Sequence, residues 1–164
     1  CASDRGDRSK PSLSFAFNCG MPDVAAFPPD LPANGVFLDL RPGLNGQVPP
    51  WVSSADIVDG AAHTILISER MSAGSWTSCQ EHEVAIIWHP RYAPPASRSA
   101  NDPYAAAHPS SRHKGVCNVG FADNSVSPIH NDMDYHVYAQ LLSPASTDAK
   151  FADTLQRVPM AFRP

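Results

Sequence analysis

Two sets of side chains could bind a metal ion. Imidazole is the commonest transition-metal ligand in proteins, and it could come from His82 beside Glu83, His89, His108, His113, His130 and His136. Calcium prefers carboxylate and carbonyl oxygens, and these could come from Asp123, Asn131, Asp132 and Asp134. The histidines do not recur four residues from another ligand on a predicted helix. Calcium is therefore the better metal candidate, and we expect no other cofactor.

Helix capping is the simpler alternative for two of these acids. The calcium candidates do not follow EF-hand spacing. Asp132 and Asp134 precede a segment in which Val137, Tyr138 and Leu141 recur at helical spacing, and a helix amino terminus favours negative charge. We expect Asp134 to cap this helix.

Enzymatic signatures are missing from the sequence. There is no Gly-x-Ser-x-Gly elbow, no His-Glu-x-x-His pair, no phosphate-binding loop and no dinucleotide fingerprint. We therefore expect a protein that is not an enzyme.

His113 and Asp123 flank a predicted hairpin. Apolar and small residues alternate over Gly115–Ala122 and again over Ser125–His130, which predicts two strands. Asp123 and Asn124 would form a two-residue turn, because both residue types tolerate positive φ. Asp123 would then have a structural role. His113 would anchor the loop before the first strand, by bonding a backbone carbonyl or Asp123.

Several separated blocks of the chain occur in an order that is typical of one bacterial family. The blocks are Cys1–Asp4, Ser14–Asn18, Asn34–Phe37, Ala55–Glu69, His113–Val126 and Asp132–Leu142. Together they resemble the pilin-like, or pseudopilin-like, proteins with a prepilin-type amino terminus and a His-x9-Asp-Gly segment near the carboxy terminus. The chain departs from that pattern at Asn124, which replaces the glycine, at Ala61–His63, which replaces Thr-Ser-Asn, and after Leu142, where a Gly-Gly-Glu ending is missing.

This resemblance implies residues that matter for the fold. They are Cys1, Cys19, Asp59, Gly60, Glu69, His113 and Asp123. Asp59-Gly60 reads most simply as a turn. Glu69 is either a buried structural carboxylate, bonding its own backbone or Arg70, or a ligand-facing acid.

The resemblance also implies a preceding segment. Family members begin with a basic leader and a long apolar helix, whereas no run here approaches the ~18 apolar residues of a membrane span, and no signal peptide is visible. We therefore expect this chain to be the carboxy-terminal portion of a longer protein.

Composition limits the class of protein. A length of 164 residues suits one domain, residues 1–164. Seventeen prolines and a charged fraction of 17% favour short strands joined by many loops. A net charge of -4 without a basic cluster argues against nucleic acid and anionic membrane surfaces as partners.

Four cysteines, Cys1, Cys19, Cys79 and Cys117, lack the CxxC pairing of zinc and redox sites. An even number suits an oxidising compartment. Cys1 with Cys19, and Cys79 with Cys117, are the candidate disulfides. Four reduced thiols remain the alternative.

The predicted fold is α+β and β-rich: an antiparallel sheet with one or two short helices and long Pro-rich loops. Further strands are expected at Leu13–Phe17, Val36–Leu40, Thr64–Glu69 and Val84–Trp88, with Thr64–Glu69 at the centre of the sheet. Ser53, with Asp56 three residues later, would cap a short helix that Gly60 ends. Residues 91–112, rich in Pro, Ala and Ser, would be an exposed loop.

The resemblance implies a structural role for this chain. We expect the globular head of a pilin-like filament subunit, exposed to the periplasm, the cell surface or the outside, that assembles with like subunits or other cell-surface proteins. The alternative is an extracellular binding module that recognises a glycan, with or without calcium, or a partner protein, through residues 91–112 and Trp76. Trp51 is a second candidate for sugar binding, Trp88 belongs to the core, and the tripeptide Arg5-Gly6-Asp7 is a chance match.

Overall fold

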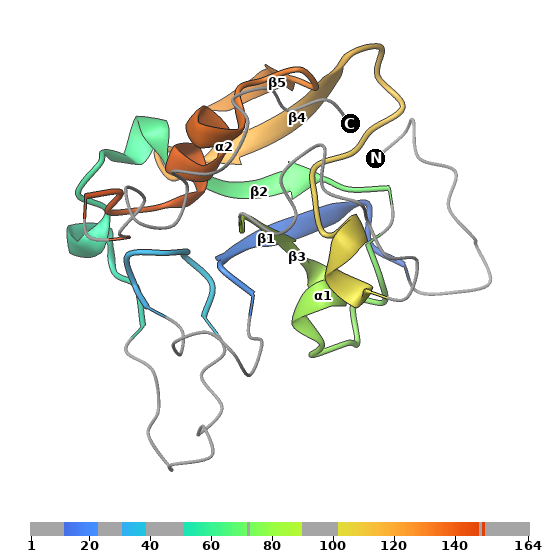
Figure 1. Ribbon diagram of the computed structural model, residues 1–164, viewed down its shortest axis with the longest axis horizontal. Helices are drawn as coiled ribbons and strands as arrows, with labels where there is room; N and C mark the ends of the chain where they lie inside the picture. The colour runs from blue at the N-terminus through green and yellow to red at the C-terminus, as the bar shows by residue number, and fades with distance from the viewer. Residues whose placement is uncertain are drawn as a thin grey trace.

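A five-stranded sheet organises the part of the chain that the computed structural model describes (Figure 1). This part comprises residues 12–22, 31–38, 51–71, 73–89, 102–147 and 149. The strands are β1 (Phe15–Gly20), β2 (Ile65–Glu69), β3 (Ala85–Ile87), β4 (Val116–Phe121) and β5 (Val126–His130). The helices are α1 (Glu81–Val84) and α2 (Tyr135–Leu142), with the 3-10 turns η1 (Ser54–Asp56), η2 (Ala61–His63) and η4 (Pro103–Ala106). The predicted α+β, β-rich class is confirmed.

The sheet is mixed, with the order β3-β1-β2-β4-β5. The pairs β1–β2, β2–β4 and β4–β5 are antiparallel, as predicted. The pair β1–β3 is parallel, so the expectation of a purely antiparallel sheet was wrong. The chain leaves β2, passes through α1 and enters β3 on the far side of β1. Because β3 then runs opposite to β2, it has the same direction as β1.

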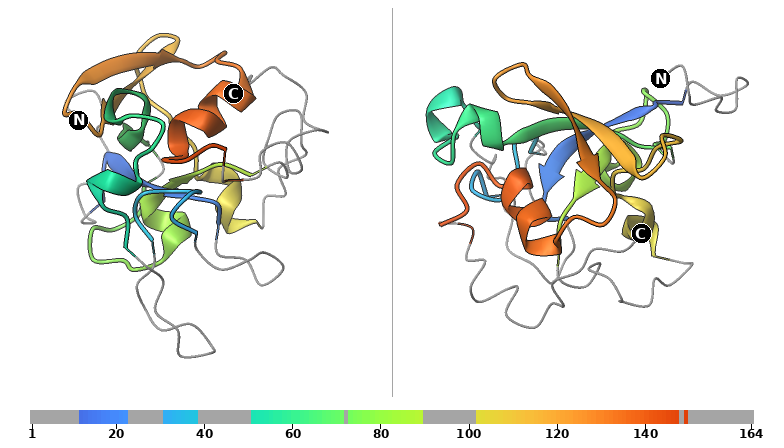
Figure 2. Two further views of the ribbon diagram at one scale, coloured as in Figure 1. Left: turned by 90° about the vertical axis from the view of Figure 1, so that its left-hand side faces the viewer. Right: turned by 90° about the horizontal axis from the view of Figure 1, so that it is seen from above.

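The main core lies between α2 and one face of the sheet, as the two views of Figure 2 show. On β1, Ala16 and Asn18 are buried on this face, whereas Phe15 and Phe17 are partly exposed on the other. Burying an aliphatic or aromatic side chain stabilises the fold by about 1.5–3 kcal/mol. The large buried side chains include Ile65, Ile86, Trp88, Val119, Tyr135, Tyr138 and Leu142, and the core position predicted for Trp88 is confirmed.

Tyrosine hydroxyls fix α2 against β3. Tyr138 Oη donates to the carbonyl of Ile87 at 2.9 Å, and Tyr135 Oη donates to the carbonyl of His89 at 2.9 Å. Burial raises the pKa of Tyr138 well above its usual value, so its hydroxyl remains a donor at neutral pH. These bonds satisfy backbone carbonyls at the end of β3 that would otherwise be buried without a partner.

Most predicted strands are confirmed, and one is wrong. Thr64–Glu69 corresponds to β2, which lies at the centre of the sheet, and Val84–Trp88 contains β3. Leu13–Phe17 overlaps β1, which begins two residues later. The strand predicted at Val36–Leu40 is missing over the described residues 36–38, where the amides of residues 36 and 37 both donate to the Asn18 carbonyl and bend the chain.

The hairpin of β4 and β5 has a longer loop than predicted. The Phe121 amide donates to the Ser125 carbonyl at 2.9 Å, and the Asn124 amide donates to the Phe121 carbonyl at 3.0 Å. Three residues, Ala122 to Asn124, therefore form the loop, and only Asn124 has positive φ, at 68°. This is the type I turn with a following left-handed residue that is common in three-residue hairpin loops.

Helix capping follows the sequence closely. Asp134 caps α2, and its Oδ1 accepts from the amides of His136 at 2.8 Å and Val137 at 3.3 Å. Asp56 Oδ2 accepts from the Ser53 amide at 2.8 Å, so the predicted capping pair forms, although the helix is the single turn η1. Hydrogen bonds from the Ser53 hydroxyl, at 2.6 Å, and from the Ser53 amide lower the pKa of Asp56.

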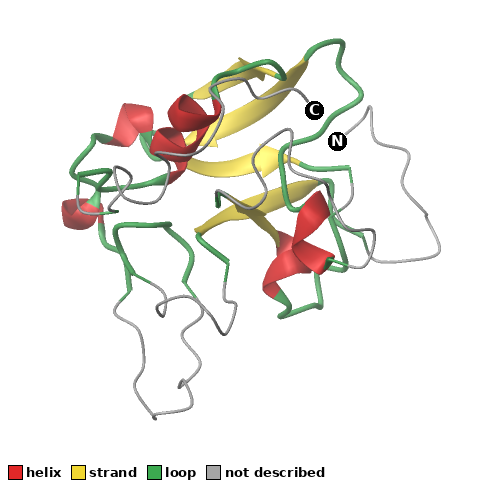
Figure 3. Cartoon of the chain, viewed as in Figure 1, coloured by secondary structure: helices red, strands yellow, loops and turns green. Residues whose placement is uncertain are grey.

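The loop predicted at residues 91–112 is described from residue 102 onward, where it begins with a short helical turn (Figure 3) and is partly buried. It contains η4, and the buried residues Tyr104 and Ala107 form a second small core with Ala85 and Ile87 of β3. Tyr104 Oη donates to Glu81 Oε2 at 2.8 Å. This loop therefore covers the side chains of Ala85 and Ile87 on β3.

None of the described helices is long and apolar enough to cross a membrane.

Candidate functional site

Two segments of equal length run antiparallel through the centre of the sheet. Asp59 and Glu69 are ten residues apart, and so are His113 and Asp123. β2 lies in the first segment and β4 in the second, and the two strands pair antiparallel. As a result Glu69 meets His113 at one end of the pair, and the Asp123 amide donates to the Ala61 carbonyl at 3.1 Å at the other. Glu69 and His113 therefore lie at one end of the β2–β4 pair, and Asp59 and Asp123 lie toward the other end.

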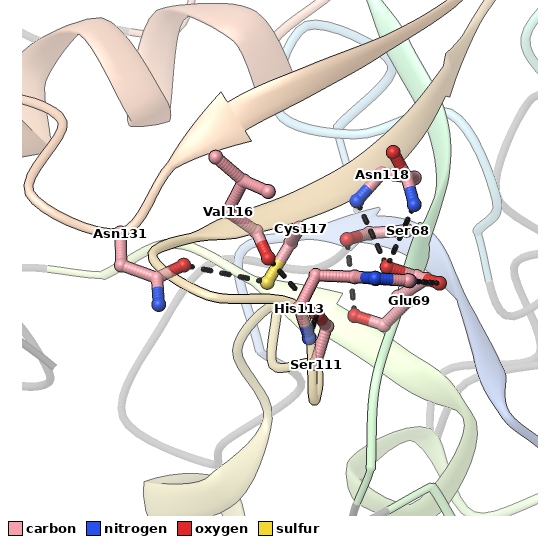
Figure 4. Close-up of polar contacts among 8 residues, drawn as sticks. All are labelled: Ser68, Glu69, Ser111, His113, Val116, Cys117, Asn118 and Asn131. Carbon is pink, nitrogen blue, oxygen red and sulfur yellow. Dashed lines mark hydrogen bonds and ion pairs between the residues drawn. The ribbon is translucent and has the colours of Figure 1, made fainter. Parts of the chain in front are cut away.

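At the end of the strand pair where Glu69 meets His113, the polar contacts centre on the Glu69 carboxylate (Figure 4). Its side chain is 4% exposed, and its Oε1 lies 3.2 Å from Nε2 of His113, whose side chain is 39% exposed. Its Oε2 accepts from the Asn118 backbone amide at 3.0 Å and from the Asn118 Nδ2 at 3.2 Å. Both carboxylate oxygens are thus used in holding the start of β4, and the predicted buried structural carboxylate is confirmed.

Serines extend this contact into the loop before β4. Ser111 Oγ donates to the Val116 carbonyl at 2.9 Å and accepts from the His113 amide at 2.8 Å. The Ser110 amide donates to the Glu69 carbonyl at 3.0 Å, and Ser110 Oγ accepts from the Met71 amide at 3.0 Å. We call the contacts of Glu69, Ser110, Ser111, His113 and Asn118 the β2–β4 brace. The His113 side chain contacts Glu69, and the predicted contact with Asp123 was wrong, because Asp123 lies at the far end of β4.

Cys117 lies beside the brace and is unsuited to nucleophilic chemistry. It is buried, and its Sγ donates to Oδ1 of Asn131 at 3.6 Å. Burial, with a smaller contribution from the Glu69 carboxylate, raises the pKa of Cys117 to about 11. The thiol is therefore protonated at neutral pH, and the thiolate is the reactive form.

Asp59 holds the opposite end of the first segment. Its Oδ2 accepts from the Ser146 amide at 2.6 Å, and its own amide donates to the Pro144 carbonyl at 3.0 Å. Gly60, with φ of 99°, forms the predicted turn, and its carbonyl accepts from the His63 amide at 2.9 Å. The sequence predicted the turn. It did not predict that Asp59 would connect the segment after α2 to the start of the β2 segment.

Asp123 closes the hairpin loop. Its Oδ1 accepts from the Ser125 amide at 2.8 Å. Hydrogen bonds from Ser125, with a weaker effect of the His63 charge, lower the pKa of Asp123. Its structural role in the turn is confirmed.

The structure does not bring the four calcium candidates together. Asp123 is at the turn of the β4–β5 hairpin, whereas Asn131, Asp132 and Asp134 follow β5 at the open end of the hairpin. The intervening strand of five residues spans roughly 15 Å. Asp134 Oδ1 is used in capping α2. Among the described residues no three His, Cys, Asp or Glu side chains are grouped for a metal ion.

The other histidines are scattered over the fold. His89 and His108 are buried, and the His108 ring lies 6.4 Å from that of Tyr138. His82 stacks edge-on against Tyr104 at 5.7 Å, His130 is exposed at the end of β5, and His136 is half-buried in α2. The transition-metal set is therefore not assembled among the described residues.

The predicted disulfide between Cys79 and Cys117 does not form, because both residues carry free thiols. Cys1 lies outside the described residues, and with it the predicted pair with Cys19. Cys79 is exposed just before α1, whereas the Cys117 thiol is buried against Asn131. One side chain lies at the surface and the other in the core, and the spacing of cysteines in the sequence could not show this difference.

Two buried polar residues were missed in the sequence. Asn18 Nδ2 donates to the carbonyls of Ile65 at 2.6 Å and Leu142 at 2.7 Å, and so joins β1, β2 and the end of α2. Arg70 donates to the carbonyls of Ala85 at 2.5 Å and His82 at 2.8 Å, and burial lowers its pKa to about 10. Asn18 could have been found, since a polar residue at an inward position of an alternating strand calls for buried partners.

Close backbone contact explains the Asn-Gly element. A Cβ on Gly20 would lie 2.1 Å from the Asn34 carbonyl oxygen, and a Cβ on Gly35 would lie 2.5 Å from the Cys19 carbonyl carbon. Only glycine fits at both places. The Asn34 carbonyl also accepts from Trp88 Nε1 at 2.8 Å, so this contact fixes the core tryptophan.

Two of the three tryptophans have side chains that are exposed to solvent. Trp51 is 79% exposed and Trp76 is 67% exposed. The tripeptide Arg5-Gly6-Asp7 lies outside the described residues.

The site is therefore a set of structural contacts around β2 and β4. A family model described as a protein of unknown function (DUF1559) matches residues 3–136 of the chain. No curated protein and no solved structure matches the chain.

Proposed function

This chain belongs to the DUF1559 family, and from that premise we propose that it is a non-catalytic structural subunit, the globular head of a pilin-like or pseudopilin-like filament. The observation that carries the proposal is that Glu69 and His113 form structural contacts within the domain. Glu69 contacts both His113 and Asn118, and both of its carboxylate oxygens accept hydrogen bonds. A general base needs a carboxylate that can reach a substrate proton.

Contacts at the other end of the β2–β4 pair also support a globular head that is exposed at the surface of a filament. Asp59 and Asp123 close the other end of the same strand pair. The contacts at the two ends hold β2 and β4 together, and loops on a rigid scaffold are where proteins place variable contacts. A head of this kind tolerates change in its loops while the strand pair stays fixed.

The proposal includes an assembly route and a location. By the resemblance of its sequence blocks, the head would be carried by a prepilin-type amino-terminal helix that packs with the helices of like subunits or of other cell-surface proteins. The head would then lie in the periplasm, on the cell surface or on an extracellular filament.

The test uses the natural full-length protein in the cells that produce it. Antibodies raised against this domain would be used for immunogold microscopy and for fractionation of the envelope and of sheared surface material. Filaments or an envelope-bound assembly that carry the label would support the proposal. Label confined to a monodisperse protein, away from the envelope and without assemblies, would overturn it.

A second candidate, an extracellular binding module, rests on the exposure of Trp51 and Trp76. Exposed aromatic rings bind sugars by stacking, and an interface commonly places tryptophan at its centre. Isothermal titration with glycans, with and without calcium, would detect such binding. Loss of the heat in W76A but not in M71A, a control at another exposed apolar residue, would favour this candidate over the filament head.

A further inference from the structure

β5 is the edge strand of the sheet, beside β4, as Figures 1 and 2 show. Its residues 126, 127, 128 and 130 are exposed, and Val126 is 73% exposed. An exposed edge presents a row of backbone donors and acceptors that can pair with another strand. The edge of this protein therefore needs a device that prevents such pairing.

The register shows which backbone groups face outward. The Phe121 amide donates to the Ser125 carbonyl and the Asn131 amide donates to the Gly115 carbonyl, at the two ends of the hairpin. In an antiparallel pair, hydrogen-bonded residues alternate with residues whose backbone groups point away from the partner. Residues 125, 127, 129 and 131 therefore pair with β4, and residues 126, 128 and 130 face outward.

Pro128 occupies the middle of the three outward positions. Proline has no amide hydrogen, and within sheets it is confined to places where no ladder bond is needed. The carbonyl of His130, another outward position, already accepts from the Met133 amide at 3.1 Å. Both groups are thereby removed from the row that an added strand would use.

We propose that Pro128 keeps the edge of β5 from pairing with β5 of a second copy of this chain. In a two-fold antiparallel pair centred on residue 128, each Pro128 would lie opposite its equivalent, and both hydrogen bonds of the central pair would be missing. Val126 would lie opposite His130, whose carbonyl is already used. The pairing is therefore blocked at its centre and weakened on both sides, and contacts between heads must use other surfaces.

The test restores the missing amide. Purified P128A and P128V would be compared with the wild-type chain by light scattering and sedimentation over a concentration series, with circular dichroism as the check of folding. P128A restores the donor with the least change of side chain, and P128V adds strand propensity. S127V is the matched control, because it adds the same propensity at a position whose amide faces β4.

We expect a monomeric wild type and S127V, and a molar mass that rises toward twofold or beyond for P128A and P128V. Adding V126K to P128V places a charge on the edge and should restore the monomer. Folded P128A that stays as monomeric as the wild type would overturn the proposal. So would a wild-type chain that already associates and becomes monomeric on V126K. If P128V does not fold, P128A alone decides.

Discussion

At the scale of single residues, the β2–β4 brace is the main finding. His113 and Glu69 are 44 residues apart in sequence, yet their side chains meet at 3.2 Å. The partly exposed imidazole adds a modest attraction, whereas the buried carboxylate satisfies the Asn118 amide, which would otherwise lose its partner. We therefore expect the Glu69 carboxylate to contribute more to the free energy of unfolding than the His113 imidazole.

We expect E69Q to lower the free energy of unfolding by about 1–3 kcal/mol, because a hydrogen bond to a charged group is replaced by a neutral one. H113A should cost about 0.2–1 kcal/mol, as for a partly exposed pair. Urea unfolding of both variants and of the double variant would measure their coupling. D132N, an acid-to-amide change at an exposed residue, is the control. Strictly additive losses would show that the two side chains do not interact.

The thiols also differ at this scale. Because burial raises the pKa of Cys117 to about 11, this thiol stays protonated as the pH rises from 7 to 9, and its thiolate appears only near pH 11. Cys79 is exposed to reagent. The two residues should therefore label at different rates.

Iodoacetamide labelling at pH 8, followed by peptide mass mapping, should modify Cys79 at least tenfold faster than Cys117 in the folded protein. Unfolding in urea should remove the difference, since burial causes it. Equal rates in the folded protein would show that Cys117 is open to solvent and that the brace does not cover it.

At the scale of elements, the β4–β5 hairpin shows why a glycine and an asparagine can exchange. Asn124 holds the left-handed position of the three-residue loop, with φ of 68°. Glycine adopts this conformation without steric cost, and asparagine is one of the few other residues that tolerate it. The departure from the family pattern at this position is therefore conservative in structure.

We expect N124A to lower the free energy of unfolding by about 1 kcal/mol, from the strain of a Cβ in the left-handed region. N124G should be neutral or slightly stabilising. S127A, at an exposed residue of β5 with ordinary φ, is the control. Thermal unfolding monitored by circular dichroism would rank the variants. A loss for N124G as large as that for N124A would mean that the asparagine side chain, and not its backbone, supports the loop.

The segment that follows α2 is a second element with a clear anchor. Residues 143–147 and 149 continue beyond the end of the family match at residue 136, and yet three separate regions hold them. The Asn18 amide binds the Leu142 carbonyl, Ser143 Oγ binds the Ala33 carbonyl, and Asp59 binds the Ser146 amide. This segment completes the core on the side of α2.

We expect D59A to lower the free energy of unfolding by about 1–3 kcal/mol, because the acceptor of a part-buried, charge-assisted hydrogen bond is removed. Limited proteolysis should cut after α2 earlier in D59A than in the wild type. D132A, an exposed aspartate in a turn, is the matched control. An unchanged cleavage pattern in D59A would show that Asn18 and Ser143 hold the segment without Asp59.

At the scale of the whole molecule, the two edges of the sheet are protected from pairing with another strand by different means. β3 is covered by the loop that carries Tyr104 and Ala107, and the Ile87 amide donates to the Ala107 carbonyl at 2.9 Å. β5 is open but carries Pro128. A head with both edges guarded can be crowded beside copies of itself without strand exchange, which suits the filament that we propose.

The local sequence determined the elements whose signals lie within a few residues. A run of β-branched and apolar residues located β2, and alternation of residue types located β4 and β5. Asp134 marked the start of α2, because strand faces and helix caps depend on neighbouring residues. The strand at Val36 and the two-residue turn were wrong because their backbone bonds go to Asn18 and Ser125, which local patterns do not include.

Only the tertiary structure decided which of these elements meet. The parallel position of β3, the contact of Glu69 with His113 and the hold of Asp59 on Ser146 join residues far apart in the chain, up to 87 positions for the last pair. The spacing of ten positions from His113 to Asp123 carried no information on which strand this segment pairs with, or in which direction. That direction comes from the antiparallel pairing of β2 with β4, which alone places an acid opposite an imidazole.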